Sequence, residues 1–309
     1  MFVEAVAVAH GRKPNSFRSS GQHSLITWIA SYLKSGSTWF RILFEALTQT
    51  DAGPVSIDGL ERVSGHAATR SLFEEFCGVR ASDLPREVVE RMRPRIYAAA
   101  ARSRSGLQCM KVHDAWTHVA PSEPLFPRSA TAAVIYLARN PLDVAVSLRF
   151  HLSVDQDAAI DFMANPRASI SAGTRKLPEQ LPQCLRRWSD HAASWLIESQ
   201  LPVHLVRYED LKSHPFETLR RAATFLDMPT DGEHIRKAID AAAFDRLQAQ
   251  EASCGFRERH RSVSVFFRRG ESGAWRTELS ESQVARIVAE HAPMMRHLGY
   301  LDEAGRLLC

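Results

Sequence analysis

Ile29-Ala30-Ser31-Tyr32-Leu33-Lys34-Ser35-Gly36-Ser37-Thr38-Trp39 is a stretch in which an apolar run stops at a lysine inside a Ser/Gly turn. We predict a buried strand over residues 25–31 and a helix over residues 38–47. Unpaired backbone N–H groups and the positive end of a helix meet in such a turn, and both attract phosphate. The Lys34 ammonium and the hydroxyls of Ser35, Ser37 and Thr38 add further donors. The stretch therefore predicts a phosphate-binding loop.

This loop differs from the usual nucleotide-hydrolase pattern G-x-x-x-x-G-K-[ST], in which a lysine follows the last glycine and the next hydroxyl binds magnesium. Here Lys34 precedes Gly36. A loop that binds phosphate without the magnesium-binding hydroxyl suits a donor whose transferred group is not a terminal phosphoryl group. An ordinary strand-to-helix turn with a solvated lysine is the alternative that remains open at this point.

Composition limits the class of protein. The 309 residues are 45% apolar and 24% charged, as in ordinary globular proteins, and we expect a single domain over residues 1–309 with an N-terminal extension at residues 1–22. The longest apolar run is far shorter than the ~20 residues that cross a bilayer, so no membrane partner is expected. A net charge of +4 suits anionic ligands, but the arginines are dispersed, so nucleic-acid binding is not expected.

Cysteine spacing and the start of the chain bear on compartment and metals. No basic start precedes the first apolar residues, so we expect no secretory signal and a cytoplasmic location. No H-E-x-x-H or calcium-loop pattern occurs, so no metal is expected. We interpret the five cysteines as reduced thiols, because a disulfide framework or a zinc site needs paired or regular spacing, which is lacking among Cys77, Cys109, Cys184, Cys254 and Cys309.

The order of the elements predicts the fold class. Parallel strands are predicted at residues 25–31, 107–113, 132–138 and 203–207, and further helices at residues 84–103 with a kink at Pro94, 141–151, 182–199 and 215–226. This alternation predicts an α/β fold with a P-loop-like central parallel sheet flanked by helices on both faces, which binds ligands at the carboxyl ends of its strands. Residues 153–177 and 250–266 fit neither period, and lids and disordered surface loops are both open interpretations.

Two basic side chains end the second predicted strand, Lys111 and His113. Residues two apart in a strand point to the same side, so both should face the mouth of the phosphate-binding loop. Histidine is the natural general base near neutral pH, and transfer to a hydroxyl needs a group that accepts the departing proton. A structural role for a lone histidine is the alternative.

Further cations follow the third strand and lie near the C-terminus. Arg139 ends the third predicted strand, where a guanidinium can bind phosphate through two hydrogen bonds, and Ser147 lies two helical turns farther on. The alternative is a helix-entry pair between Arg139 and Asp143. The segment Phe267-Arg268-Arg269-Gly270 joins two arginines to a glycine that lets backbone approach a ligand, although a solvated charge run is the ordinary explanation.

Together these segments resemble the cytosolic-type sulfotransferase family, in its bacterial type, over residues 25–275. Residues 32–39 are similar to the family's YPKSGTTW loop, with Leu33 in place of the proline and Ser37 in place of a threonine. Lys111 and His113 match the family's KTH segment, in which Val112 replaces the threonine. The resemblance implies that the donor, 3′-phosphoadenosine 5′-phosphosulfate (PAPS), is bound through its 5′-phosphosulfate by Lys34, Ser35, Gly36, Ser37, Thr38 and Trp39.

The resemblance also implies contacts to the rest of the donor. Arg139 and Ser147 match the residues that hold its 3′-phosphate. Tyr208 is similar to a tyrosine that contacts adenine and Phe244 to an aromatic residue that packs on the base, although a core position is the alternative for each. The family's RKG segment is matched by Arg268, Arg269 and Gly270, in which Arg269 replaces the lysine.

The implied reaction is transfer of a sulfuryl group from PAPS to a hydroxyl of a small-molecule acceptor, with adenosine 3′,5′-bisphosphate as product and without a metal. In this scheme His113 is the general base, Lys34 stabilises the leaving group and Lys111 assists at the sulfuryl oxygens. Ser147 holds Lys34 toward the 3′-phosphate until the acceptor arrives.

The sequence leaves the acceptor open among a phenol, an aliphatic alcohol, a glycan, a peptide-derived natural product and an amine. Its pocket is expected to be formed by loops such as residues 56–70 and 153–177. Residues 276–290 do not match the family's dimer motif, and Ala274 replaces the aspartate of its GDWK segment, so the oligomeric state stays open. An atypical P-loop kinase, which would need magnesium, and a non-catalytic nucleotide-binding protein are the alternative functions.

Overall fold

The computed structural model describes residues 24–49, 55–60, 64–103, 105–173, 178–259 and 265–308. Its central sheet has five parallel strands in the order β2-β3-β1-β6-β9. β1, β3, β6 and β9 confirm the predicted strands to within a residue or two, whereas β2 lies in a stretch that we expected to be a loop. The strands are β2 (Ser64–His66), β3 (Gln108–Val112), β1 (Ile26–Ser31), β6 (Thr131–Ala138) and β9 (Val203–Arg207).

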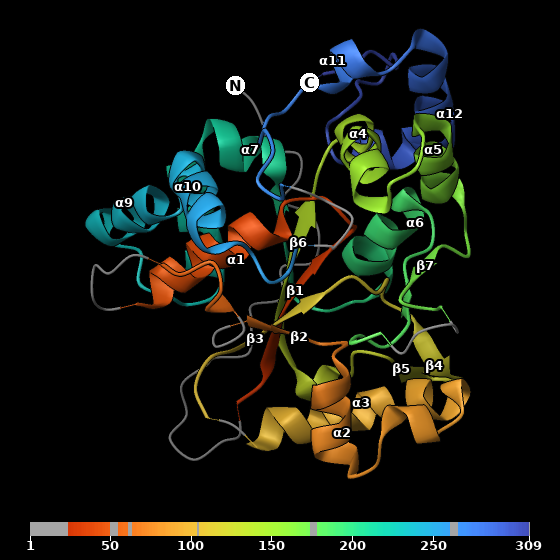
Figure 1. The fold of residues 1–309 in the computed structure, drawn as a ribbon, viewed down its shortest axis with the longest axis vertical. Helices are drawn as coiled ribbons and strands as arrows, with labels where there is room; N and C mark the ends of the chain where they lie inside the picture. Colours follow the sequence, from red (N-terminus) through yellow and green to blue (C-terminus); the bar gives the residue numbers. More distant parts are fainter. Residues whose placement is uncertain are drawn as a thin grey trace.

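Helices cover both faces of this sheet, as predicted (Figure 1). Alternate residues of a strand point to opposite faces, so Trp28 and Val134 pack in one core while Ile29 and Ile135 pack in the other. The first core is covered by α2 (Arg70–Cys77), α3 (Arg86–Ser103), α4 (Pro141–Leu152), α5 (Gln156–Ala164), α6 (Trp188–Ala193) and α12 (Glu281–His297). The second is covered by α1 (Ser37–Thr48), α7 (Tyr208–Ser213), α8 (Pro215–Phe225), α9 (Gly232–Ala241) and α10 (Phe244–Cys254).

One sequence prediction about the middle of the chain is wrong, and one unassigned segment gains secondary structure. The helix predicted over residues 182–199 begins only at Trp188, because Gln183–Cys184 form β8, which pairs with β7 (Ser169–Ile170), and Arg186 adopts a left-handed φ of 59°. It then continues as a π-helical turn, Ser194–Glu198. Residues 153–177, which we could not assign, contain α5 and β7 in their described part.

Short elements complete the described chain: β4 (His118–Ala120), β5 (Glu123–Pro124), α11 (Trp275–Glu278) and the 3-10 turns Ala81–Asp83 and Arg128–Ala130. No helix in the described ranges has both the length and the apolar character needed to cross a bilayer. Cys77, Cys109, Cys184 and Cys254 are free thiols. Residues 1–22, Cys309 and part of the second unassigned segment, residues 260–264, lie outside the described residues.

Candidate functional site

The predicted site residues come together at the carboxyl ends of β1, β3 and β6. β1 lies between the other two strands, so the loop after it is flanked by His113 on one side and Arg139 on the other. Ser35 of this loop is buried beneath the surface rather than in the lining. The pocket is lined by the predicted residues Lys34, Gly36, Ser37, Thr38, Trp39, Lys111, His113, Arg139, Ser147, Tyr208, Phe244, Arg268, Arg269 and Gly270.

The predicted phosphate-binding loop has backbone geometry that its sequence explains. Lys34 and Gly36 both adopt left-handed φ angles, 63° and 92°. A Cβ atom at Gly36 would lie 2.6 Å from Cδ2 of Tyr208, so a glycine is required there. Gly36 precedes α1 and offers no side-chain cap to its first N–H groups, and the Ser35 hydroxyl is buried without a partner among the described residues. Donors are thus left for an anion.

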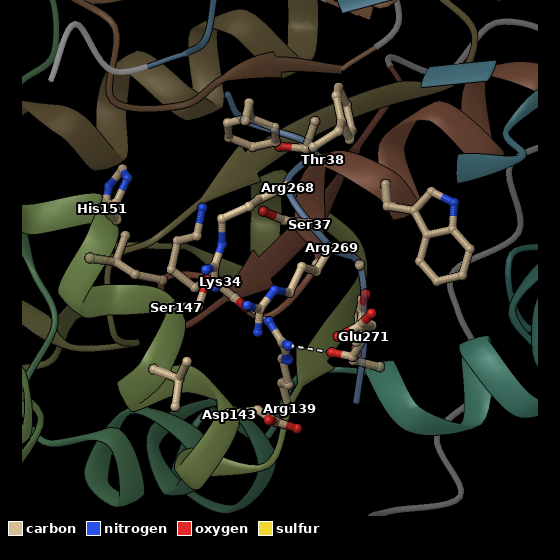
Figure 2. Close-up of a pocket in the computed structure, with 18 of the residues that line it drawn as sticks. Lys34, Ser37, Thr38, Arg139, Asp143, Ser147, His151, Arg268, Arg269 and Glu271 are labelled. Atoms are coloured by element: carbon tan, nitrogen blue, oxygen red, sulfur yellow. Dashed lines mark hydrogen bonds between the residues drawn. The ribbon is translucent and has the colours of Figure 1, made fainter. Parts of the chain in front are cut away.

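Several cations converge on this loop. The side chains of Lys34, Arg139, Arg268 and Arg269 project toward one another in the pocket (Figure 2). Burial, together with repulsion from Arg139, Lys111 and Arg268, lowers the pKa of Lys34 to about 8. Its Nζ lies 4.7 Å from the centroid of the Phe266 ring. Such a concentration of positive charge favours a ligand that carries several negative charges.

Arg139 is held at the end of β6 by backbone carbonyls and an aromatic ring. Its Nη1 donates to the carbonyl of Lys34 at 3.2 Å and its Nη2 to the carbonyl of Glu271 at 2.8 Å (Figure 2). Its guanidinium carbon lies 4.5 Å from the Tyr208 ring centroid, and its Nε is buried without a partner among the described residues. The guanidinium therefore keeps a donor for a ligand.

Asp143 does not make the ion pair with Arg139 that we considered as an alternative. Its carboxylate accepts from the N–H of Gly273 at 2.7 Å and of Trp275 at 3.2 Å. These bonds tie the segment after Arg268 to α4, which begins where the Asn140 side chain caps the N–H of Leu142 at 3.0 Å. Asp143 thus fixes the loop that carries the second set of cations.

The Arg-Arg-Gly segment is only partly a solvated charge run. Arg269 is about half exposed and pairs with Glu278 at 2.7 Å. The Arg268 guanidinium lies 3.9 Å from the Phe150 ring centroid and faces the pocket. Gly270 has a φ of 61°, and a Cβ atom there would collide with the Phe244 ring, so Phe244 packs directly on this backbone. The glycine lets the segment approach the aromatic wall of the pocket.

The surroundings of His113 are compatible with the predicted role of general base. Its Nδ1 lies 2.9 Å from the carbonyl oxygen of Ser31, an acceptor, so Nδ1 carries the proton and Nε2 keeps its lone pair. Burial, followed by the nearby charges of Lys111 and His66, holds the pKa of His113 well below its usual value. The imidazole is therefore neutral and able to accept a proton across the physiological pH range.

Lys111 and Ser147 complete the predicted catalytic set. Lys111 comes from β3 and lines the pocket beside His113, two residues along the strand, as predicted. Ser147 comes from α4 and lies near Lys34 in Figure 2, but no hydrogen bond joins them within the described part of the chain. The proposed restraint of Lys34 by Ser147 therefore stays a prediction.

Comparison with known proteins identifies the family. Residues 26–298 match the model of the sulfotransferase domain. The chain belongs to the sulfotransferase family. Among curated relatives, the cytosolic sulfotransferase 8 of Arabidopsis thaliana is 25% identical over 275 residues, which cover 85% of this chain and 75% of the relative. The flavonol 3-sulfotransferase of Flaveria bidentis is 20% identical, with 86% and 80% covered.

Solved structures of sulfotransferases share the fold of this chain. A mouse sulfotransferase complexed with PAP aligns with a TM-score of 0.56 and 16% identity, over 93% of this chain and 88% of that chain. Retinol dehydratase in complex with androsterone and inactive cofactor PAP aligns with a TM-score of 0.54 and 19% identity, over 88% and 80%. The relatives named here are plant and animal proteins, so the bacterial type of this sulfotransferase stays a prediction.

Sequence reasoning missed an acidic residue in the pocket of this sulfotransferase. Both oxygens of Glu258 accept from Nη1 of Arg41, at 2.6 and 2.8 Å, and Oε2 also accepts from Nζ of Lys111 at 3.1 Å. Burial would raise the pKa of Glu258, but the attraction of Lys111 and Arg41 outweighs it and lowers the pKa to about 2. Glu258 lies in residues 250–266, which gave no periodic signal, and its partners are more than 140 residues away in sequence.

His66 is a second residue that the sequence did not single out. It ends β2, directly beside Lys111 in register, and its ring centroid lies 5.8 Å from that of His113. Its Nδ1 accepts from the N–H of Ala68 at 3.2 Å. Burial, followed by repulsion from Lys111, holds the pKa of His66 well below its usual value. Within the described residues, no group of three or more His, Cys, Asp or Glu side chains is arranged to hold a metal ion.

Proposed function

We propose that this sulfotransferase moves a sulfuryl group from PAPS to a hydroxyl of a small-molecule acceptor and releases adenosine 3′,5′-bisphosphate. The observation that carries the proposal is the convergence of Lys34, Arg139 and Arg268 on a pocket that also contains His113 with a free Nε2. PAP in the mouse neighbour is the same compound as the proposed product, which supports this donor. A cytoplasmic location agrees with the names of the plant relatives.

The residues present fit a nucleotide donor that carries phosphate on both its 3′ and its 5′ positions. The buried Ser35 hydroxyl and the Arg139 Nε have no partners among the described residues, and α1 lacks a side-chain cap. We assign the 3′-phosphate to Arg139, Ser147 and the Arg268-Arg269-Gly270 segment, and the 5′-phosphosulfate to the loop of residues 34–39. The adenine would lie among the aromatic side chains of Trp39, Tyr208 and Phe244.

The chemistry then follows from the positions of the protein groups. His113 Nε2 takes the proton of the acceptor hydroxyl as its oxygen forms a bond to sulfur. The bond between sulfur and the 5′-phosphate oxygen breaks, and its electron pair leaves on that oxygen, where Lys34 stabilises the charge. Lys111 stabilises the sulfuryl oxygens. Positioning and charge stabilisation supply most of the catalysis, as in phosphoryl transfer, and no metal enters the scheme.

The test is transfer of radiolabelled sulfur from PAPS to a panel of phenols, alcohols, glycans, peptide-derived natural products and amines, in chelator. Transfer to at least one hydroxyl acceptor without metal is expected. Adenosine 3′,5′-bisphosphate should raise the melting temperature more than ADP does, because a ligand at ~100 times its Kd adds about 2.7 kcal/mol. Equal responses to both nucleotides would overturn the donor assignment. Magnesium-dependent phosphoryl transfer from ATP would indicate a kinase instead, and binding without transfer a non-catalytic protein.

The variant Arg139→Ala tests the assignment of the donor's 3′-phosphate to Arg139. Loss of its charge-assisted hydrogen bonds should weaken the binding of adenosine 3′,5′-bisphosphate by roughly 1.5–3 kcal/mol and leave the binding of ADP almost unchanged. Arg220→Ala is the matched control, because Arg220 is exposed on α8 and pairs only with Glu217 in the described structure. An unchanged affinity in Arg139→Ala would remove this residue from the 3′-phosphate site.

A further inference from the structure

We infer that Glu258 is a positioning residue for sulfuryl transfer: its carboxylate, fixed by Arg41, holds the Lys111 ammonium beside the reacting centre. The inference rests on the proposed function and deepens it, because it gives Lys111 a partner that the motif itself does not contain. Glu258, Lys111 and His113 all line the same pocket. In the chain Arg41–Glu258–Lys111, the first two side chains are fixed and the lysine is the flexible member.

Arg41 is the fixed member. It lies in the second turn of α1 and is 1% exposed. Its Nε donates to the Ser64 hydroxyl at 2.8 Å and its Nη2 to the Ser64 carbonyl at 2.6 Å. Ser64 is the first residue of β2, so the guanidinium is bonded to the edge of the central sheet. Turning this buried guanidinium would break its bonds to Ser64 and Glu258 and leave charged donors unsatisfied, which is costly.

Glu258 is fixed in turn by Arg41. Nη1 contacts both of its oxygens, at 2.6 and 2.8 Å, which are short, charge-assisted bonds. Its Oε2 is left to accept from Lys111 Nζ at 3.1 Å. The Lys111 side chain has four rotatable bonds and is the flexible partner. Glu258 uses one of the three Lys111 N–H donors, and the other two have no hydrogen-bond partner within the described residues, so they can serve sulfuryl oxygens.

The charge balance favours a positioning role over a blocking one. Glu258 is one carboxylate between two cations, so the group keeps net positive charge beside the pocket. Without Glu258, Lys111 would face the cations Arg41 and Lys34 with no compensating carboxylate among the described groups that act on it, and repulsion would turn its ammonium away. Because Arg41 holds the carboxylate, donor binding does not need to displace it.

The test is a double-mutant cycle of Glu258→Gln and Lys111→Met, with kcat as the readout. Glu258→Gln should lower kcat on the order of 10- to 100-fold, the loss expected from a misplaced group. In the Lys111→Met background, the same change should lower kcat less than about 2-fold, because the group that Glu258 positions is gone. Glu217→Gln, which removes an exposed carboxylate of α8, is the charge-matched control. Equal losses in both backgrounds would overturn the inference.

The alkaline limb of the kcat profile gives a second readout, because at saturating donor the bound anion raises the Lys34 pKa and leaves Lys111 to be observed. Glu258 opposes the burial that lowers the pKa of Lys111. Glu258→Gln should therefore move the alkaline limb to lower pH, whereas Glu258→Asp, which keeps the charge, should leave it in place and restore part of kcat. A limb that does not move in Glu258→Gln would contradict the positioning role, since a purely structural role predicts no such movement.

Folding and function are separated by two further comparisons. Glu258→Gln leaves Arg41 buried without its carboxylate, which destabilises the fold, so Arg41→Met/Glu258→Gln is made beside it to remove the stranded cation. This pair should also show the fall in kcat, and a wild-type kcat in it would refute the inference. Absence of transfer by the wild-type protein would overturn the proposed function, and the inference with it; transfer by the wild type with unchanged kcat in Glu258→Gln would overturn the inference alone.

Discussion

Lys34→Met should make the ligand-free protein more stable while it removes donor binding. The pKa of Lys34 falls from 10.5 to about 8 in the folded protein. At 1.36 kcal/mol for each pH unit, this fall corresponds to a destabilisation of about 3 kcal/mol by the charged side chain. Lys34 keeps some contact with solvent, so we expect a gain of roughly 1–3 kcal/mol, or about 2–6 °C in Tm, for an unbranched methionine that packs on Phe266.

The pH dependence of this gain isolates Lys34. Between about pH 8 and 10.5, Lys34 is protonated in the unfolded chain more than in the folded protein. The destabilisation that Lys34 causes therefore decreases as the pH rises through this window. The advantage of Lys34→Met should be complete below about pH 8 and should disappear toward pH 10.5. Chemical denaturation of both proteins across this range measures it, because the other titrating groups cancel in the difference. Lys237→Met, at an exposed ion pair of α9, is the charge-matched control.

Two results would refute this reasoning. A Lys34→Met protein that is less stable than wild type at neutral pH would mean that the ammonium is satisfied in the folded protein rather than frustrated. A stability difference that stays constant across the titration range would mean that the gain comes from packing, not from charge. In either case the cation cluster would not be held ready for an anion.

Three further predictions concern the same pocket. His113→Ala should lower turnover by roughly 10²- to 10⁴-fold while adenosine 3′,5′-bisphosphate binds as before, and retained turnover in a steady-state assay would exclude His113 as the base. Gly270→Ala should weaken binding of the bisphosphate at least ~10-fold, because the added Cβ displaces the Phe244 ring. Calorimetry measures this affinity, and a wild-type value would show that the ring is not part of the site. In the wild type, kcat/KM for the donor should fall above about pH 8, where Lys34 of the free enzyme loses its proton. In contrast, kcat should fall only at higher pH, because the bound anion raises the Lys34 pKa. If kcat and kcat/KM fell at the same pH, the prediction would be contradicted.

The strands that the sequence predicts best are those buried on both faces. β6 is buried at every residue and reads as one apolar run, so its period and length are unambiguous. β2 has only Ser64, Gly65 and His66, without an apolar run, and becomes a strand solely because it pairs with β3. The helix predicted from residue 182 fails for a related reason, because β7 supplies a pairing partner that outweighs local propensity.

The site could be predicted to the extent that its residues follow strands. The carboxyl ends of parallel strands lie at one edge of a sheet, so Lys34, His113 and Arg139 had to meet once β1, β3 and β6 were neighbours. Asp143 and Glu258 could not be found this way. Each acts through contacts to residues more than 125 positions away, Gly273 in the first instance and Arg41 in the second, and no local pattern encodes such pairs.

The two lysines of the site differ in how their charge is compensated before a ligand binds. Burial, and after it repulsion from the surrounding cations, holds the pKa of Lys34 low until an anion arrives, and the fold carries that strain in the ligand-free state. Lys111 instead has Glu258, whose own low pKa keeps the carboxylate ionised throughout the working range. The first arrangement makes binding of a polyanion favourable, since binding relieves repulsion. The second gives the Lys111 ammonium a counter-charge before the donor binds, which offsets part of the burial that lowers its pKa and agrees with the positioning role inferred above.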